Sequence, residues 1–164
     1  MQHTLSILVE NRAGVLSRIA GLFARRGFNI ESLVVGTTHN PEISRITIIT
    51  VGDDDTIEQI TKQLHKLPDV LMVKHLRGAS FFSRELVLIK VATDSSNRSE
   101  IMQIVDIFRA HVVDISLTTT TLEITGTNEK IKAIIQLLEP YGIIEVARTG
   151  QLAIERGEDC MAVE

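Results

Sequence analysis

Cysteine and aromatic residues are scarce in this sequence, and each shortage excludes a class of protein. The one cysteine, Cys160, cannot form a disulfide within the chain, which fits a reducing compartment. Tryptophan is absent, and aromatic residues make up only 4% of the chain. Sheets that bind RNA stack bases on aromatic side chains, so we do not expect an RNA-binding protein.

Long apolar runs and an excess of positive charge are also missing. No run of about 18 or more apolar residues occurs, so we expect no membrane span. The formal net charge is −4, which argues against binding to nucleic acids or anionic membranes. The first residues lead into an apolar strand without a signal or transit pattern. Together these features predict a cytoplasmic protein, and a bacterial cytosol fits them best.

The first half of the chain alternates strand and helix patterns in a regular order. Of the 164 residues 44% are apolar, which is enough for a packed core. Four β-rich runs are predicted as strands: 5–9, 29–36, 43–51 and 70–76. The apolar stripe of the first helix consists of Leu16, Ile19, Ala20 and Phe23. Acidic residues 53–55 cap a second helix, and Pro68 ends it, so the order is βαββαβ.

The second half repeats this order. Strands are predicted at residues 85–92, 111–117, 121–125 and 143–147. Asn97 and Glu100 have the spacing of a capping box before one helix, and Pro140 ends the other. We therefore predict a first domain at 1–77, a linker at 78–83, a second domain at 84–150 and a polar, frayed tail at 151–164.

Two βαββαβ units predict an α+β protein made of two tandem ferredoxin-like domains. Each would have an antiparallel sheet of four strands with both helices on one face. The other face is then open, and residues such as Val34, Val35 and Ile49 make both sides of the central strands apolar. An open apolar face of this kind usually marks an interface, so we expect either a dimer or a larger oligomer, or packing of one half of the chain on the other.

Residue patterns typical of catalysis or metal binding are weak. The acids at 53–55, together with Glu58, could coordinate Mg²⁺, but acids in a first helical turn are better explained as caps. The five histidines have no i, i+4 spacing, so no metal site is predicted. Ser17 has no Gly-x-Ser-x-Gly context, and we predict a chain that is not an enzyme by itself.

The most informative segment is the polar turn between the first strand and the first helix. It contains Asn11 and Gly14 and leaves backbone N–H groups free at a helix N-terminus. These groups and the helix dipole favour a small anion such as a carboxylate, and the Asn11 amide can donate or accept. The turn therefore predicts a site that holds a small ligand without transforming it.

Several motifs resemble one family. Residues 11–16 (NRAGVL) and 25–33 (RRGFNIESL) resemble an ACT domain. Residues 43–48 (ISRITI), 108–114 (FRAHVVD) and 145–150 (EVARTG) extend the resemblance over nearly the whole chain. Taken together, these motifs are similar to the small, regulatory subunit of acetolactate (acetohydroxyacid) synthase, in which the N-terminal ACT domain is followed by a second ferredoxin-like domain.

The resemblance implies a regulatory function. Such subunits activate a catalytic subunit that uses thiamine diphosphate, Mg²⁺ and FAD, and the small subunit itself holds no cofactor. They also confer feedback inhibition by a branched-chain amino acid, usually valine, with leucine and isoleucine as alternatives. The resemblance implies that one subunit faces the effector with Asn11, Ala13, Gly14 and Val15, and a second with Asn29 and Ile30. Ser17 and Leu33 would support this site.

Two other functions stay open on the sequence. A free-standing tandem ACT sensor could bind the same amino acid and act on another partner, such as a transcription regulator. A purely structural oligomer would need no ligand, although the composition of the turn argues against it. An assay of acetolactate formation by the catalytic subunit, with and without this chain, distinguishes these functions from the regulatory one.

Overall fold

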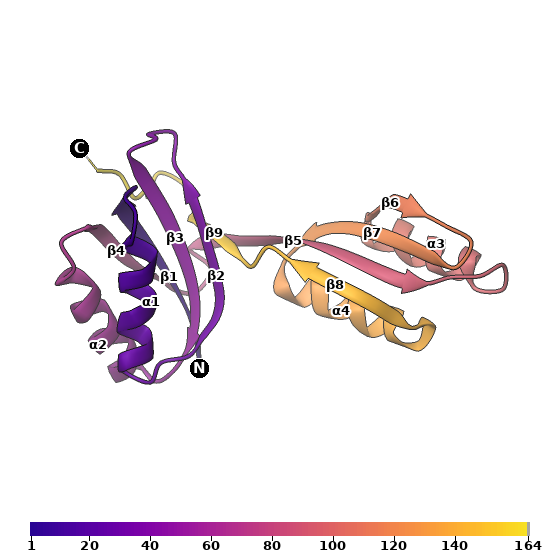
Figure 1. Ribbon diagram of the computed structural model, residues 1–164, viewed down its shortest axis with the longest axis horizontal. Helices are drawn as coiled ribbons and strands as arrows, with labels where there is room; N and C mark the ends of the chain where they lie inside the picture. Colours follow the sequence, from indigo (N-terminus) through magenta and orange to yellow (C-terminus); the bar gives the residue numbers. More distant parts are fainter. Residues whose placement is uncertain (164) are drawn as a thin grey trace. The chain divides into compact units, whose positions relative to one another are not determined.

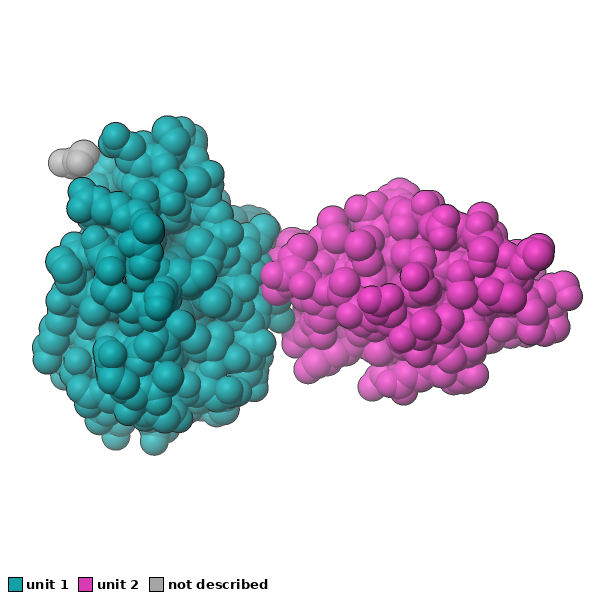
Figure 2. All heavy atoms as spheres, in the orientation of Figure 1, with its two compact units in different colours: residues 1–82, 151–164 teal, residues 83–150 magenta. Residues whose placement is uncertain are grey.

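Residues 1–163 are described by the computed structural model, which divides into the two compact units coloured in Figure 2. The first unit contains residues 1–82 and the chain from residue 151 on, and the second contains residues 83–150. Each unit has the βαββαβ order of a ferredoxin-like domain, with its helices on one face of an antiparallel sheet (Figure 1). The predicted fold class is therefore confirmed.

Unit 1 contains a sheet of four strands in the order β2-β3-β1-β4. Its elements are β1 (Gln2–Glu10), α1 (Val15–Arg25), β2 (Ile30–Thr37), β3 (Ile43–Val51), α2 (Asp54–His65) and β4 (Val70–Leu76). All neighbouring strands are antiparallel, and β1 aligns with β3 over its whole length from Gln2↔Val51 to Glu10↔Ile43. This order leaves β2 as an edge strand.

The core of unit 1 lies between the sheet and the two helices. Alternate residues of β1, such as Leu5 and Ile7, are fully buried against it. The buried residues of α1 are Val15, Ile19, Leu22 and Phe23. The predicted stripe was thus wrong at its first position, because Leu16 is 41% exposed and Val15 takes its place. The helix starts directly after the left-handed turn at Gly14, and this sets which residue of the first turn faces inward.

The outer face of this sheet is covered by the end of the chain. Strand β9 (Leu152–Glu155) crosses this face, where Arg45 Nη2 donates to Ala153 O at 2.9 Å and Lys74 Nζ contacts Glu155 Oε2 at 2.8 Å. Ile49, on the same face, is only 2% exposed. The predicted open apolar face is therefore only partly present in unit 1, because Ile49 is covered whereas Val51, two residues along β3, is 46% exposed. The frayed tail is wrong for residues 152–155, because this short segment finds hydrogen-bond partners on the sheet.

Unit 2 repeats the architecture with its own core. Its elements are β5 (Phe81–Ala92, beginning in unit 1), α3 (Arg98–Phe108), β6 (His111–Ile115), β7 (Thr119–Gly126), α4 (Asn128–Leu138), a 3-10 turn (Glu139–Tyr141) and β8 (Ile143–Arg148). The strand order is β6-β7-β5-β8, and β9 also pairs with β5. Fully buried Ile89, Leu122 and Ile134 lie in its core. Because β5 begins at Phe81, part of the predicted linker is strand.

Helix caps explain where the helices begin. The Asp53 side chain accepts a hydrogen bond from Thr56 N at 2.8 Å, so the predicted acidic cap of α2 is confirmed. The predicted capping box of α3 is wrong, because Asn97 makes no side-chain cap and Glu100 accepts a bond from the Tyr141 hydroxyl at 2.8 Å. Asp94 takes over locally by accepting from Ser96 N at 2.7 Å. Within residues 1–163, no helix is long and apolar enough to cross a membrane.

Candidate functional site

The turn between β1 and α1 is exposed and shaped by glycine. Gly14 is the N-cap residue of α1 and has φ 85°, a left-handed conformation that side chains disfavour. Glycine offers no side-chain cap, and the hydrogen bond from Val15 N to Arg12 O is long at 3.4 Å. The first N–H groups of α1 therefore remain available to an anionic group from outside.

Asn11 fastens this turn to the loop between β2 and β3. Its side-chain Nδ2 donates to Pro41 O at 2.9 Å, and its backbone N donates to Glu42 O at 2.7 Å. The loop is itself ordered, because Asn40 Oδ1 accepts from Glu42 N at 3.0 Å. The Asn11 amide N–H thus donates to the loop. Because Asn11 is exposed, its Oδ1 remains accessible as an acceptor for a ligand. Sequence reasoning did not anticipate the contact with Pro41, which is 30 residues away.

Arg18 reaches back over the same turn. A Cβ atom built on Gly14 would lie 3.1 Å from Arg18 Nη1, which is closer than ordinary contact. The guanidinium forms an ion pair with Asp69, which is 8% exposed, and Asp69 O accepts from Glu10 N at 2.9 Å. Arg18 was not among the predicted site residues. Its position one helical turn after Gly14 is the sequence signal that could have indicated it.

The predicted site residues divide between the two ends of α1. Asn11, Ala13 and Gly14 lie at its N-terminal end, whereas Asn29 and Ile30 follow its C-terminal end. A helix of 11 residues spans roughly 16 Å, so one copy of the chain does not bring the two groups together. The backbone of Asn29 is fixed by Thr50 Oγ1, which donates to Asn29 O at 2.7 Å.

The supporting residues also differ in what they can offer. Ser17 is exposed on the first turn of α1, so its hydroxyl lies next to the turn. Ile30 and Leu33 are half-buried and pack on the core of unit 1. The side chain of Val15 is only 4% exposed, so this residue presents its backbone to the turn. The apolar side chain exposed there belongs to Leu16, which the helical periodicity predicts to be buried.

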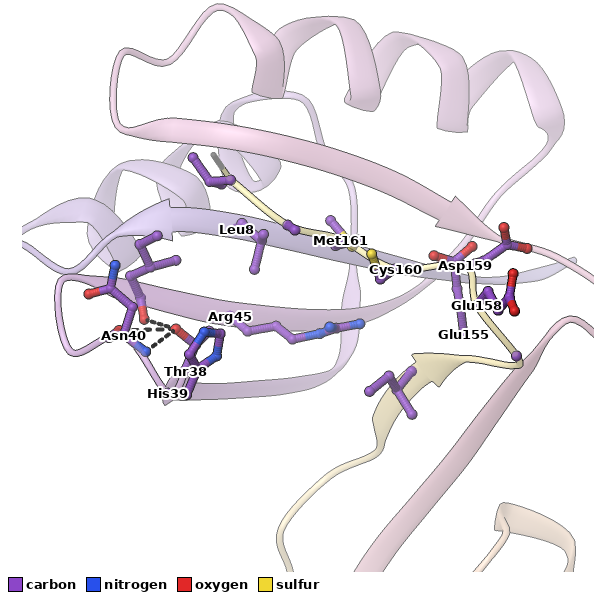
Figure 3. A pocket seen from close by; sticks show the side chains of 15 residues that line it. Leu8, Thr38, His39, Asn40, Arg45, Glu155, Glu158, Asp159, Cys160 and Met161 are labelled. Atoms are coloured by element: carbon purple, nitrogen blue, oxygen red, sulfur yellow. Dashed lines mark hydrogen bonds between the residues drawn. The ribbon is translucent and has the colours of Figure 1, made fainter.

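A separate cavity of about 490 Å³ lies on the outer face of unit 1, between the β2–β3 loop and the end of the chain (Figure 3). Leu8 and Arg45 line it from the sheet, and residues 157–163 line it from the other side. Burial lowers the pKa of the Arg45 guanidinium, and the nearby Glu155 carboxylate opposes that shift. None of the predicted site residues lines this cavity.

The chemistry available at the turn is that of binding. Backbone N–H groups, an amide oxygen and an exposed leucine can hold a zwitterion with an apolar side chain. Within residues 1–163, no three His, Cys, Asp or Glu side chains gather to hold a metal ion. His39, the histidine of the β2–β3 loop, lines the outer cavity rather than the turn.

Comparison with known families and structures gives a consistent result across the chain. The family "AHAS small subunit-like ACT domain" matches residues 5–72, and the family "Small subunit of acetolactate synthase" matches residues 84–157. The chain is 50% identical to the acetolactate synthase small subunit of Mycolicibacterium smegmatis, over 94% of this chain and 91% of that protein. It is 52% identical to the probable small subunit of Methanothermobacter thermautotrophicus, over 97% and 95% of the two chains.

A solved structure agrees with these relatives. The crystal structure of the acetolactate synthase small subunit from Thermotoga maritima is 43% identical and has a TM-score of 0.90. The match covers 97% of this chain and 99% of that one. The likeness therefore extends through both units.

Proposed function

The chain belongs to the acetolactate synthase small-subunit family, and from this we infer that it is a regulatory subunit without catalysis of its own. It binds the catalytic subunit, which carries thiamine diphosphate, Mg²⁺ and FAD, and raises its activity. It also makes that activity sensitive to a branched-chain amino acid, with valine as the first candidate and leucine or isoleucine as alternatives. The observation that carries this proposal is the exposed turn at Gly14 in a chain that matches the family from end to end.

The effector site is completed by a second copy of the chain. Strand β2 is an edge strand, so its outer edge can pair with β2 of another copy. In an antiparallel, two-fold pairing, Ile30 at the start of one strand lies opposite Thr37 at the end of the other. Thr37 leads directly into the loop that holds Asn11. This arrangement supports a site with Asn11 and Gly14 from one copy and Asn29 and Ile30 from its partner.

Each part of an amino acid has a matching group in this arrangement. The carboxylate meets the free N–H groups at the start of α1, next to Gly14. The ammonium meets amide oxygens of Asn11 and Asn29. The aliphatic side chain meets Ile30 of the partner copy and Leu16, whose side chain is 41% exposed. An effector held in this way links two copies of unit 1 and thereby stabilises one arrangement of the dimer.

One assay tests the regulatory function directly. The purified chain is added to its catalytic subunit, and acetolactate formation is measured with and without valine, leucine and isoleucine. We expect activation by the chain and inhibition by at least one of the three amino acids. Binding of an amino acid without any effect on acetolactate formation contradicts the proposal and indicates a sensor that acts on another partner.

A further inference from the structure

Two histidines and an arginine form a hydrogen-bonded series in unit 1. This series reaches the loop between β4 and β5, at residues 77–80. His3, on β1, is 7% exposed, and its Nδ1 lies 3.1 Å from His75 Nε2, on β4. The other nitrogen of His3 lies 3.0 Å from Gly52 O. Arg77 Nε donates to His75 Nδ1 at 2.9 Å. The three side chains border an open depression of about 380 Å³.

The positions of the protons follow from one fixed donor. The arginine Nε always carries hydrogen, so His75 Nδ1 must accept, and a neutral His75 then carries its proton on Nε2. That N–H donates to His3 Nδ1, so a neutral His3 carries its proton on Nε2 and donates to Gly52 O. This is the one assignment in which every contact has a donor and an acceptor, and it requires both rings to be neutral.

An additional proton on either ring breaks this series of hydrogen bonds. It must bind either His75 Nδ1 or His3 Nδ1, and each of these atoms already faces an N–H group. Burial lowers the pKa of His75, the charges of Arg77 and His3 lower it further, and Asp54 at the start of α2 opposes them. The amino-terminal residue Met1 also lines the depression. The hydrogen-bonded series with neutral rings is therefore the form present near neutral pH, and protonation in acid breaks its hydrogen bonds.

The hydrogen-bonded series ends at Arg77, in the loop that leads from β4 to β5. Arg77 is the first residue after β4, and its carbonyl accepts from the Ser80 hydroxyl at 2.6 Å. Ser80 O in turn accepts from Arg156 N at 2.8 Å, in the segment after β9. The histidine pair thus anchors the start of this short loop, and the bond from Arg156 N holds its end.

We propose that His3, His75 and Arg77 form a pH-sensitive latch that holds the loop at residues 77–80 against β1 when both rings are neutral. Protonation of the pair releases Arg77 and so frees the start of the loop, while the bond from Arg156 N to Ser80 O remains. Acid therefore loosens the connection locally while the core of unit 1 stays folded. This device is independent of the effector site, because none of the proposed effector residues belongs to it.

Hydrogen exchange of the full chain tests the latch. Backbone amides at residues 77–81 are followed between about pH 7.5 and about pH 5.5, and each rate is divided by its intrinsic rate. We expect the normalised rates to rise as the pH falls, by up to about tenfold per pH unit. In His75→Gln, whose carboxamide keeps donors and an acceptor but cannot titrate, the normalised rates should rise less with acid than in the unaltered chain, because one of the two proton-binding ring nitrogens is gone. His65→Gln, on the exposed end of α2, is the matched control and should behave like the unaltered chain.

Nitrogen NMR of the unaltered chain gives a second, independent test. We expect the imidazole signals of His3 and His75 near neutral pH to show protons on both Nε2 atoms. A proton on His75 Nδ1 near neutral pH overturns the proposal. Exchange at residues 77–81 that does not change with pH in the unaltered chain, or that changes equally in His75→Gln, also overturns it.

Discussion

The side-chain amide of Asn11 donates to the carbonyl oxygen of Pro41 at 2.9 Å, and this bond joins the turn before α1 to the loop after β2. Because Asn11 is exposed, the bond contributes little to folding but fixes the position of the turn. We expect Asn11→Ala to weaken effector binding by roughly tenfold and to change the free energy of unfolding by less than about 1 kcal/mol. Calorimetry and urea unfolding measure the two effects, and Asn128→Ala in α4 is the control.

Gly14→Asp should abolish the response to the effector and leave activation of the catalytic subunit intact. The new side chain meets the Arg18 guanidinium at 3.1 Å and places a negative charge beside the proposed carboxylate position. Losing one charge-assisted contact costs about 1.5–3 kcal/mol, or roughly ten- to hundredfold in affinity. Gly157→Asp, also at positive φ but in open space, is the matched control. Equal affinity of Gly14→Asp and the unaltered chain would mean that the effector does not lie at this turn.

Asn29→Ala should weaken effector binding from the other side of the shared site, by less than Gly14→Asp because it introduces no charge. The backbone of Asn29 stays in place, since Thr50 Oγ1 contacts its carbonyl oxygen and not its side chain. Mixing Asn29→Ala with Gly14→Asp chains gives dimers in which one of the two sites is free of both changes. Recovery of about a quarter of the original binding capacity in the mixture supports a shared site, and no recovery contradicts it.

Arg148→Ala should destabilise unit 2 by about 2–3 kcal/mol. The side chain of Glu85 is only 1% exposed. Its carboxylate accepts one hydrogen bond from Arg148 Nη2 and a second, at 3.1 Å, from Arg148 Nε. The substitution therefore leaves a buried carboxylate without its cation. Lys62→Ala removes the exposed ion pair with Glu58 and should change stability by less than about 0.5 kcal/mol. Urea unfolding compares the two. Similar losses in both would show that burial of Glu85 does not matter.

Acid should weaken the start of α2 through Asp53. Hydrogen bonding from Thr56 lowers the pKa of the Asp53 carboxyl, so the folded value lies below the unfolded one. The cap therefore stabilises α2 fully above the pKa of the carboxyl in the unfolded chain, which is about 3.9. Its contribution is lost as the pH falls through the lower pKa of the folded chain. Asp53→Asn keeps an acceptor that cannot titrate, so its urea midpoint should fall less between about pH 5 and about pH 3. Asp55→Asn is the control, and an equal effect there would contradict the prediction.

Local signals in the sequence predicted most of the fold correctly. Strands β3 and β4 were predicted at their observed bounds because β-branched residues alternate between clear turn signals. The start of α2 followed from Asp53, whose side chain caps the residue three positions later. Leu16 was misassigned because the positions of Val15 and Leu16 are both compatible with an apolar stripe, and only the geometry at Gly14 separates them.

Contacts between residues far apart in the chain could not be predicted from local sequence patterns. Strand β9 is only four residues long and is held by Arg45 and Lys74, more than 80 residues earlier, so no nearby pattern indicates it. The turn at Gly14 was predicted as a unit because its residues are adjacent. The separation of Asn29 from that turn follows from the helix predicted between them, whereas the sharing of the site by two subunits came only from the resemblance to a family.

The return of β9 to the first sheet affects how the protein is made. Residues 83–150 are all synthesised before the strand that completes unit 1. At about 5–20 residues per second, translating these 68 residues takes roughly 3–14 s. During that interval the apolar outer face around Leu8 and Ile49 has no cover from its own chain, so the nascent chain is exposed to aggregation until its last residues emerge.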